Sequence, residues 1–182
     1  YVSLCDWEKI SPQQLLEAIS ENTEKENKIR KSKGFSALHV IGWLLEPTLD
    51  RNTNTVFWAI EGVNEGYDEH IANSVALRLG RYGYEKIVWV TDKDSYTPFG
   101  GELDIMLRAH SFDCGHKYSD FSKGDKIASY GIATLVAATV GGKIAKVGGL
   151  AVVFKKLGGV IAAGLGAVFY KLRRIFRRRK DR

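Results

Sequence analysis

The feature that most constrains this chain is its C-terminal end, where a glycine-rich apolar run is followed by arginines. Residues 157–170 contain no charged side chain, and large apolar residues recur there at helical spacing. Glycines and alanines recur every fourth residue on the opposite side, which lets helices approach closely in a bilayer. In a helix surrounded by water, each glycine costs about 1 kcal/mol relative to alanine. The run therefore predicts a helix in a membrane.

Residues 157–176 form the best single span, because a transmembrane helix needs roughly 20 mostly apolar residues. Lys155 and Lys156 mark its outer edge, since a lysine at the bilayer centre costs about 2.5–3.5 kcal/mol. The basic residues at the other end can extend their long side chains to the membrane surface. The predicted anchor consists of Leu157, Val160, Ile161, Leu165, Val168, Phe169, Leu172, Arg173 and Arg174.

The excess of positive charge after the span predicts its orientation. The rule that basic loops stay inside places residues 177–182 in the cytoplasm and the main domain on the other side of a bacterial inner membrane, in the periplasm. Two alternatives remain open. Residues 127–140 can form a first span of a hairpin with Lys143 and Lys146 at its turn, or the last helix can lie in the membrane interface.

The overall charge of +6 is unevenly distributed. From residue 151 onward, ten lysines and arginines face Asp181 alone, a local charge of +9, so the first 150 residues carry −3. The high isoelectric point belongs to the tail, and phosphate binding would not explain the apolar run that precedes it. We therefore expect the lipid bilayer as a partner and no nucleic acid.

The first 125 residues predict an α+β extracytoplasmic domain. Ser11 and Pro12 open a helix that Gly34 ends, and a second helix is expected at 103–109. Short strands are expected at 36–45, 55–60, 69–79 and 85–91, with Pro47 interrupting the first. Short turns between them favour an antiparallel meander sheet of about four strands with flanking helices. Residues 126–156 then form an apolar and amphipathic helical connector to the C-terminal membrane-anchor helices.

One candidate binding cluster follows the expected first strand. Trp43 and Trp58 are expected to pack across neighbouring strands, with Asp50 stabilising the turn between them through an Asx-type hydrogen bond. The alternative is an exposed aromatic groove for a peptide or a glycan. Arg81 is expected to pair with Glu46 or Asp50.

A second candidate cluster contains Tyr118, Asp120 and Asp125. Asp125 comes just before the apolar run, so it is expected to cap that helix and to oppose its dipole, with a contribution of about 0.5–2 kcal/mol. Asp120 and Asp125 can also serve as an acid/base pair, and the sequence gives no separation between them.

No metal or cofactor is expected. His110, Cys114 and His116 are close in sequence, but their spacing matches no standard zinc motif. The phosphate-binding loop, the nucleophile elbow, the HExxH motif and the calcium loop are all missing from the sequence, and no catalytic residue is assigned. The two cysteines, Cys5 and Cys114, are expected to be inert buried thiols rather than a single bridge.

Four blocks of sequence together carry a family resemblance, and they are YVSLCDW (1–7), GWLLEPTLDRNTNTVFWA (42–59), LGRYG (79–83) and FDCGHKYSDFSKGDKIASYGIATLVA (112–137). The chain resembles the bacterial family of predicted membrane-anchored proteins known as domain of unknown function 2167, from residue 1 to about residue 156. The resemblance implies an N-terminal signal peptide, an extracytoplasmic domain and a C-terminal membrane anchor. It implies no known activity.

The expected function is that of a membrane-anchored periplasmic module without enzymatic activity, which binds a partner or supports the bacterial envelope. The partner is an envelope protein or a second copy held through the ridges of small residues. Two other functions remain open. One is an envelope hydrolase that uses Asp120 and Asp125, and the other is a membrane-perturbing protein that acts through its basic apolar end.

Overall fold

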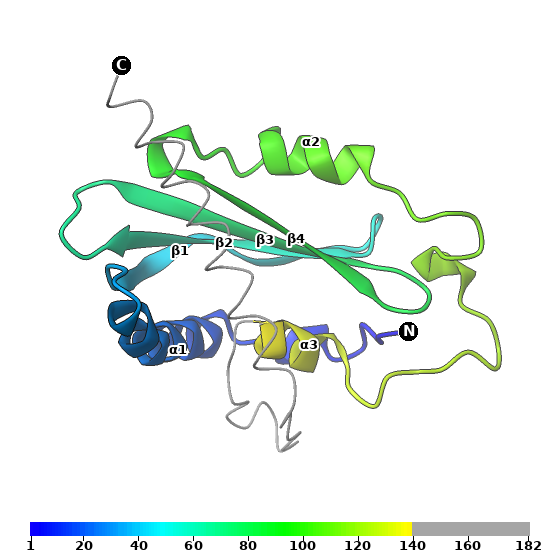
Figure 1. Ribbon diagram of the computed structural model, residues 1–182. Coiled ribbons are helices and arrows are strands. Elements are labelled where there is room, and N and C mark those ends of the chain that lie inside the picture. The colour runs from blue at the N-terminus through cyan, green and yellow to red at the C-terminus, as the bar shows by residue number, and fades with distance from the viewer. Residues whose placement is uncertain (140–182) are drawn as a thin grey trace.

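Four antiparallel strands in the order β1-β2-β3-β4 form the centre of the computed structural model, which describes residues 1–139 (Figure 1). The strands are β1 (Leu38–Asp50), β2 (Thr55–Asn64), β3 (His70–Leu79) and β4 (Tyr84–Asp92). Each pairs with the next along the chain, which confirms the predicted α+β meander.

Helices cover both faces of this sheet. The long helix α1 (Pro12–Ser32) and the short α3 (Ile132–Thr139) lie on one face, and α2 (Glu102–Ala109) lies on the other (Figure 1). Single 3₁₀ turns occur at η1 (Trp7–Lys9), η2 (Lys93–Ser95) and η3 (Tyr118–Asp120). Helix α1 begins as predicted, because the Ser11 hydroxyl accepts a hydrogen bond from the Gln14 amide at 3.3 Å and Pro12 follows it.

The predicted end of the first strand before Pro47 is wrong. Strand β1 continues through Pro47 to Asp50, with three shifts of register against β2 between Val40 and Thr48. Proline cannot donate a ladder hydrogen bond, and it is tolerated because β1 is an edge strand with irregular pairing. Strand β2 also extends past Gly62 to Asn64.

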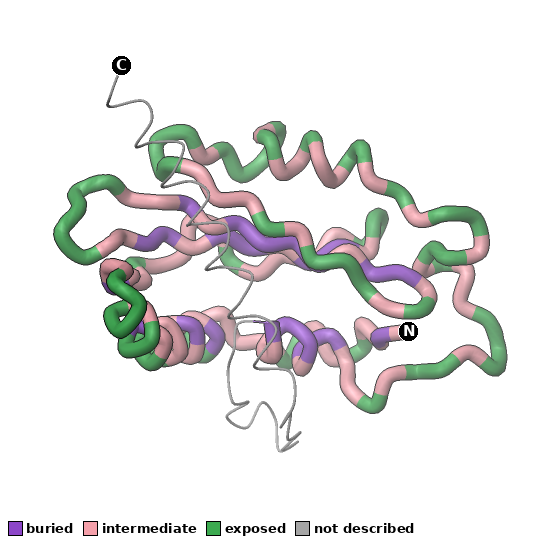
Figure 2. The backbone as a smooth tube through the Cα atoms, in the orientation of Figure 1, coloured by how far each residue is buried: buried purple, intermediate pink, exposed green. Residues whose placement is uncertain are grey.

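The hydrophobic core lies between the sheet and the helices α1 and α3 (Figure 2). Its buried members come from the N-terminal segment, α1, β2, β3 and α3: Val2, Leu15, Ile19, Val56, Trp58, Val75, Leu77, Leu79, Ile132, Leu135 and Val136. Trp43 packs against this core, but the register places it opposite Ile60 and not opposite Trp58. Its indole nitrogen donates to the Pro12 carbonyl at 3.3 Å, which links β1 to α1.

The N-terminal segment holds α3 in place, and the N-terminus lies beside that helix (Figure 1). Ser3 forms a parallel bridge with Gly131, and its carbonyl accepts from the Ile132 amide at 2.9 Å. The carbonyl of Tyr1 accepts from the Ala128 amide at 2.8 Å. The first three residues of the chain and the start of α3 are therefore held together by backbone hydrogen bonds.

The predicted cap of the apolar helix is wrong. The helix begins at Ile132 rather than directly after Asp125, so Asp125 does not reach its free amides. Asp6 takes this role instead, because its carboxylate accepts from the Ala133 amide at 3.3 Å. A negative charge at a helix N-terminus is favourable, and here it comes from the other end of the domain.

The predicted anchor at 157–176, the interfacial alternative and the basic tail lie outside the described residues, as does the connector beyond residue 139. Of the hairpin's first span, predicted at 127–140, the described part is helical only in α3, from Ile132 to Thr139. Among the helices of residues 1–139, none combines the length and the apolarity that a bilayer crossing requires.

Both cysteines differ from expectation. Cys5 and Cys114 are free and exposed, so the prediction of buried thiols is wrong. Neither contributes to the core in the way that a small apolar residue would.

The contact between Asp6 and Gly131 gives a stability prediction, because a β-carbon on Gly131 would overlap the Asp6 carboxylate. We expect Asp6→Ala to lower the free energy of unfolding by about 0.5–2 kcal/mol. Gly131→Ala is expected to cost more in the wild-type background than in the Asp6→Ala background. Thermal unfolding of the full chain in mild detergent measures this, at about 2–4 °C per kcal/mol for this length.

Glu8→Ala is the matched control, since Glu8 is an exposed acid in the same segment. Equal costs for Gly131→Ala in the two backgrounds would contradict the overlap.

Candidate functional site

A pocket of about 250 Å³ lies at one end of the sheet, where three segments meet. The β1–β2 turn forms one wall, the end of β3 forms the floor, and the loop after α2 forms the other wall. We call it the sheet-end pocket, and its lining residues are Asn52, Thr53, Asn54, Arg78, Leu79, Ser111, Phe112, Lys117, Tyr118 and Ser119. Sequence alone could not show that these segments converge.

Asp50 organises the first wall, as its predicted Asx-type hydrogen bond indicates. Its carboxylate accepts from the Asn52 amide at 2.8 Å and from the Thr53 hydroxyl at 2.7 Å. These bonds, the Thr53 hydroxyl first, hold the pKa of Asp50 below its ordinary value. Asn54 adopts a left-handed backbone conformation with φ of 51°, and its carbonyl accepts from the Leu79 amide at 3.0 Å. These hydrogen bonds thus hold the turn in one shape.

The opposite wall is tied to the β3–β4 turn. Lys117 forms an isolated bridge with Gly80, and its amide donates to the Asp120 carboxylate at 2.9 Å. A β-carbon on Gly80 would lie 2.9 Å from the Phe112 ring, so only glycine allows this close approach. Asp120 shapes the rim of the pocket, because its hydrogen bond with the Lys117 amide closes the turn that carries Tyr118 and Ser119.

Tyr118 connects the pocket to the N-terminal segment. Its hydroxyl donates to the Val2 carbonyl at 2.8 Å, and its ring stacks on Tyr1 with the ring centres 4.4 Å apart. Burial, with a smaller contribution from Tyr1, raises the pKa of Tyr118 well above its usual range. The phenol is therefore a neutral hydrogen-bonding and stacking group near pH 7, and not a nucleophile.

The lining of the pocket combines apolar and polar groups and carries positive charge. Arg78 and Lys117 are its charged members, and no acidic side chain lines it. The Arg78 guanidinium donates to the Leu107 carbonyl, which ties it to the end of α2. Asp50, just outside the lining, offsets part of the charge of Arg78. The remaining groups are hydroxyls, amides, two aromatic rings and the side chain of Leu79.

An ion pair next to the pocket holds the second wall against the sheet. Arg81 donates to both carboxylate oxygens of Asp125, at 2.7 and 2.9 Å, and to the hydroxyl of Ser122 at 2.8 Å. The predicted pairing of Arg81 with Glu46 or Asp50 is therefore wrong. The guanidinium holds the pKa of the Asp125 carboxyl below its ordinary value, and the carboxylate raises the pKa of Arg81.

This arrangement leaves little chemistry for an Asp120–Asp125 pair. Asp125 is committed to Arg81 and also accepts from the Ser122 amide at 2.8 Å. Asp120 accepts from a backbone amide in a different turn. A carboxylate with a lowered pKa and a bidentate cation is a poor proton donor near neutral pH.

The two tryptophans lie outside the pocket. Trp58 is 2% exposed and belongs to the core, and Trp43 is half-buried between β1 and α1. Their positions argue against an aromatic groove. Among the six predicted binding residues, Tyr118 lines the pocket, Asp50 and Asp120 shape its rim, and Asp125 supports it through Arg81.

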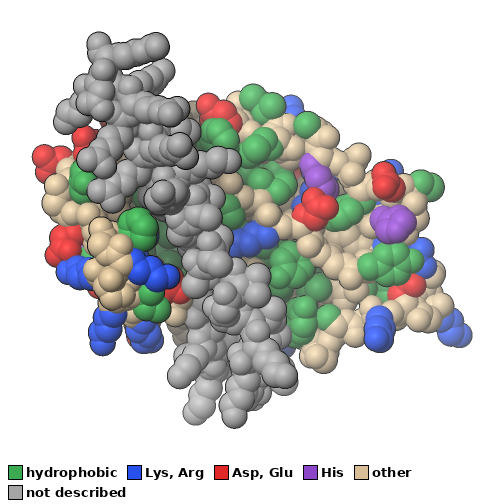
Figure 3. All heavy atoms as spheres, in the orientation of Figure 1, with side chains coloured by type: hydrophobic (Ala, Val, Ile, Leu, Met, Phe, Trp, Pro, Cys, Tyr) green, Lys and Arg blue, Asp and Glu red, His purple; other side chains and the backbone are tan. Residues whose placement is uncertain are grey.

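The histidines near Cys114 have separate partners. His110 contacts Glu85 at 2.5 Å, while the ring of His116 packs edge-on against Tyr82. Within residues 1–139, no three His, Cys, Asp or Glu side chains come together in a way that could hold a metal ion. On the face shown in Figure 3, acidic and basic side chains of the described part are interspersed.

Sequence reasoning missed one polar cluster on the α2 face of the sheet. Glu61 lies within β2 and is nearly buried, yet its carboxylate contacts both His70 and Lys93, the latter at 2.7 Å. Lys93 and then His70 lower the pKa of Glu61. The available signal was a single acid inside the apolar strand TVFWAIEGVN. This cluster lines neither the sheet-end pocket nor the hollow along α1 that is described next.

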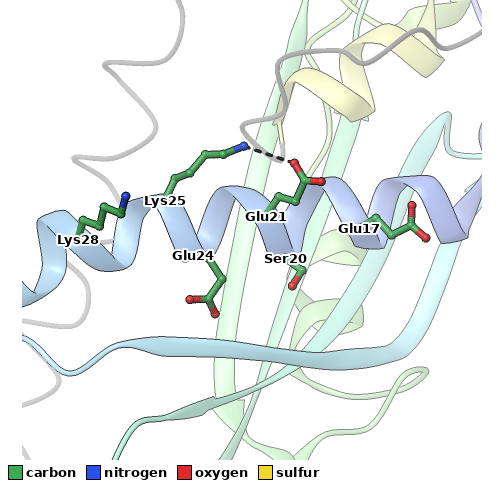
Figure 4. A pocket seen from close by; sticks show the side chains of 6 residues that line it. All are labelled: Glu17, Ser20, Glu21, Glu24, Lys25 and Lys28. Atoms are coloured by element: carbon green, nitrogen blue, oxygen red, sulfur yellow. Dashed lines mark hydrogen bonds and ion pairs between the residues drawn. The ribbon is translucent and has the colours of Figure 1, made fainter.

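A larger hollow of about 620 Å³ lies along α1 (Figure 4). Its described lining residues all come from this one helix, and they are Glu17, Ser20, Glu21, Glu24, Lys25 and Lys28. The single contact drawn among them is the exposed pair of Lys25 and Glu21 at 3.4 Å. Exposed pairs of this kind contribute little to stability, so they do not fix the side chains along this hollow. The sheet-end pocket, in which three segments converge, is the better candidate site.

Comparison with known proteins gives one match. The family model described as "Protein of unknown function (DUF2167)" matches residues 1–168. No curated protein and no solved structure matches the chain significantly.

The Arg81–Asp125 pair predicts a pH-dependent loss of stability. Asp125→Asn removes a carboxylate whose folded pKa is lowered, so its stabilising effect is present above the ordinary pKa of 3.8 and disappears as the pH falls through the lowered value. We expect the melting temperature of the variant to lie below that of the wild type at pH 7, and the difference to shrink below about pH 3.8.

Asp113→Asn is the control, because Asp113 is exposed in the same loop. Arg81→Lys is expected to behave like Asp125→Asn, since lysine cannot form the bidentate contact. A difference that stays constant from pH 7 to pH 2 would contradict the ion-pair account.

Proposed function

Since the chain belongs to the DUF2167 family of proteins of unknown function, we propose that it is a membrane-tethered extracytoplasmic module that binds an envelope component through the sheet-end pocket. The observation that carries this proposal is the pocket itself. Three segments, each fixed by its own hydrogen bonds, bring polar groups together around one cavity. Preformed concave sites with a few convergent polar groups are typical of binding sites.

The size and lining of the pocket favour one unit of a larger molecule. A volume of about 250 Å³ is below the range of roughly 300–1,000 Å³ that suits drug-sized ligands. Hydroxyls and amides suit a polyhydroxylated or amide-bearing unit, and the rings of Phe112 and Tyr118 give it apolar contact. Arg78 and Lys117 favour an anionic substituent. Cell-wall polymers present units of this kind.

The tether is supported by the sequence of the C-terminal end. Residues 157–176 have the length and composition of a membrane span with arginines after it, and the family match extends to residue 168, which includes much of this run. A domain held at a membrane surface meets an envelope polymer at high local concentration. This supports a scaffolding role without any catalytic step.

The tether predicts how the protein fractionates. The full chain with its natural leader is expected to remain in the membrane pellet after a carbonate wash, whereas deletion of residues 157–182 releases it. Deletion of 177–182 alone is the control, because it keeps the apolar run, and that variant is expected to stay in the pellet. Reporters fused after Ser122 and after Arg182 are expected on opposite sides of the membrane.

Two outcomes would contradict this topology. Both reporters on one side would replace the single span with a hairpin. Release of the full chain by carbonate would remove the tether from the proposal.

The pocket predicts a selective loss of binding. The full chain in mild detergent is expected to co-sediment with purified peptidoglycan, and Lys117→Ser and Ser119→Ala are expected to lower the bound fraction several-fold. Salt should weaken binding, because charge contributes to it. Lys123→Ser is the matched control, since Lys123 is exposed on the same loop but does not line the pocket. An equal loss with Lys123→Ser would show a general attraction between charges instead of a site.

A further inference from the structure

Strand β4 is an edge of the sheet with a regular, open side. Its pairing with β3 is unbroken from Tyr84 to Asp92, and no other strand of residues 1–139 pairs with its outer side. The opposite edge, β1, is protected by Pro47 and three register shifts. Natural proteins protect exposed edges because an open edge accepts another strand. The β4 edge of this sheet is therefore open to pairing with another strand, whereas the β1 edge is protected from it.

Apolar side chains at this edge remain exposed. Val88 pairs with Val75 of the core, so it lies on the face that carries α1 and α3, yet it is 38% exposed. Tyr84 on the same strand is 39% exposed. The core face therefore continues outward to an edge that the described helices cover only in part, where the Lys86 ammonium donates to the carbonyl of Thr139 at the end of α3, at 3.4 Å.

We propose that β4 pairs antiparallel with β4 of a second copy, about a twofold axis at Trp89, to form a continuous sheet of both copies. A twofold axis normal to the sheet brings residues of the same face opposite each other. Centred on Trp89, the register places Lys86 opposite Asp92 of the second copy and Val88 opposite Val90. Centred on Val88 or Ile87, it places Lys86 opposite a valine instead.

The charges favour self-pairing over pairing with an arbitrary strand. The Lys86 ammonium uses one of its three donors on the Thr139 carbonyl of the same copy. A lysine within an edge strand deters partners, because an apolar neighbour would remove its charge from water. A partner strand with an acid at the matching position relieves this penalty, and β4 itself is such a strand. Asp92 is exposed, and its carboxylate makes no capping bond to the helical turn that follows it. The twofold axis repeats the Lys86–Asp92 pair on both sides.

Cysteine cross-linking tests the register directly. Cys5→Ser and Cys114→Ser first remove the two exposed free thiols. Full chains carrying Val88→Cys or Val90→Cys, with tags of different size, are then mixed under mild oxidation in detergent. Opposite residues have Cα atoms about 4.5–5.5 Å apart, within the range of roughly 4.4–6.8 Å for disulfides. Identical residues are diagonal neighbours at about 7–8 Å, which is too far.

The expected product is the mixed disulfide, at least several-fold above either chain with itself. Ile41→Cys on the opposite edge strand is the control, since Ile41 is 53% exposed. A mixed product no more abundant than that of the control would overturn the pairing. A Val88→Cys chain that cross-links better with itself would overturn the register.

A charge exchange tests the selectivity. In both tagged chains, Lys86→Asp or Asp92→Lys is expected to reduce the mixed disulfide several-fold, because like charges then face each other. The double variant Lys86→Asp/Asp92→Lys is expected to restore it. An unchanged melting temperature shows that each variant still folds, and failure of the double variant to restore cross-linking would overturn the proposed register.

Discussion

The ion pair between Arg81 and Asp125 is the contact on which the candidate site depends. Arg81 lies in the tight turn between β3 and β4, and Asp125 lies at the far end of the loop that forms the second wall of the pocket. The same guanidinium also donates to the Gly115 carbonyl at 3.2 Å, so one side chain secures both parts of that loop. A planar fork with five donors suits this task better than a lysine would. With the loop fixed, Tyr118 and Lys117 have defined positions.

Local patterns predicted the fold well, and distant contacts explain where they failed. The meander followed from short apolar runs separated by turn residues, and the Asp50 turn followed from hydrogen bonds within three residues. Pro47 did not end β1, because the position of a strand in the sheet decides whether its amide is needed. The cap of α3 came from Asp6, and no local rule relates residue 6 to residue 133.

In the candidate site, too, local patterns identify residues, but contacts between distant segments decide what those residues do. The motif that contains Tyr118, Asp120 and Asp125 predicts that they belong to one site, and they do lie around one wall of the pocket. Their partners, Val2, Lys117 and Arg81, decide what each side chain does. The pairing turns Asp125 from a candidate acid into a fixed anion. Burial likewise depends on the place of a strand in the sheet, because Trp58 on the inner strand β2 is 2% exposed, whereas Trp43 on the edge strand β1 is half-buried.

The two proposed surfaces are compatible with each other in space. The pocket lies at the end of the sheet where β3 ends and β4 begins, and the open edge runs along the outer side of β4. A twofold axis at Trp89 would therefore place the two pockets at opposite ends of one continuous sheet. A pocket that takes a single unit, as proposed, would bind weakly from one copy alone. Two rigidly linked pockets would bind a repeating polymer with an affinity that depends on their spacing, because the second contact becomes intramolecular. A small pocket and a weak edge contact would then reinforce each other on an extended ligand.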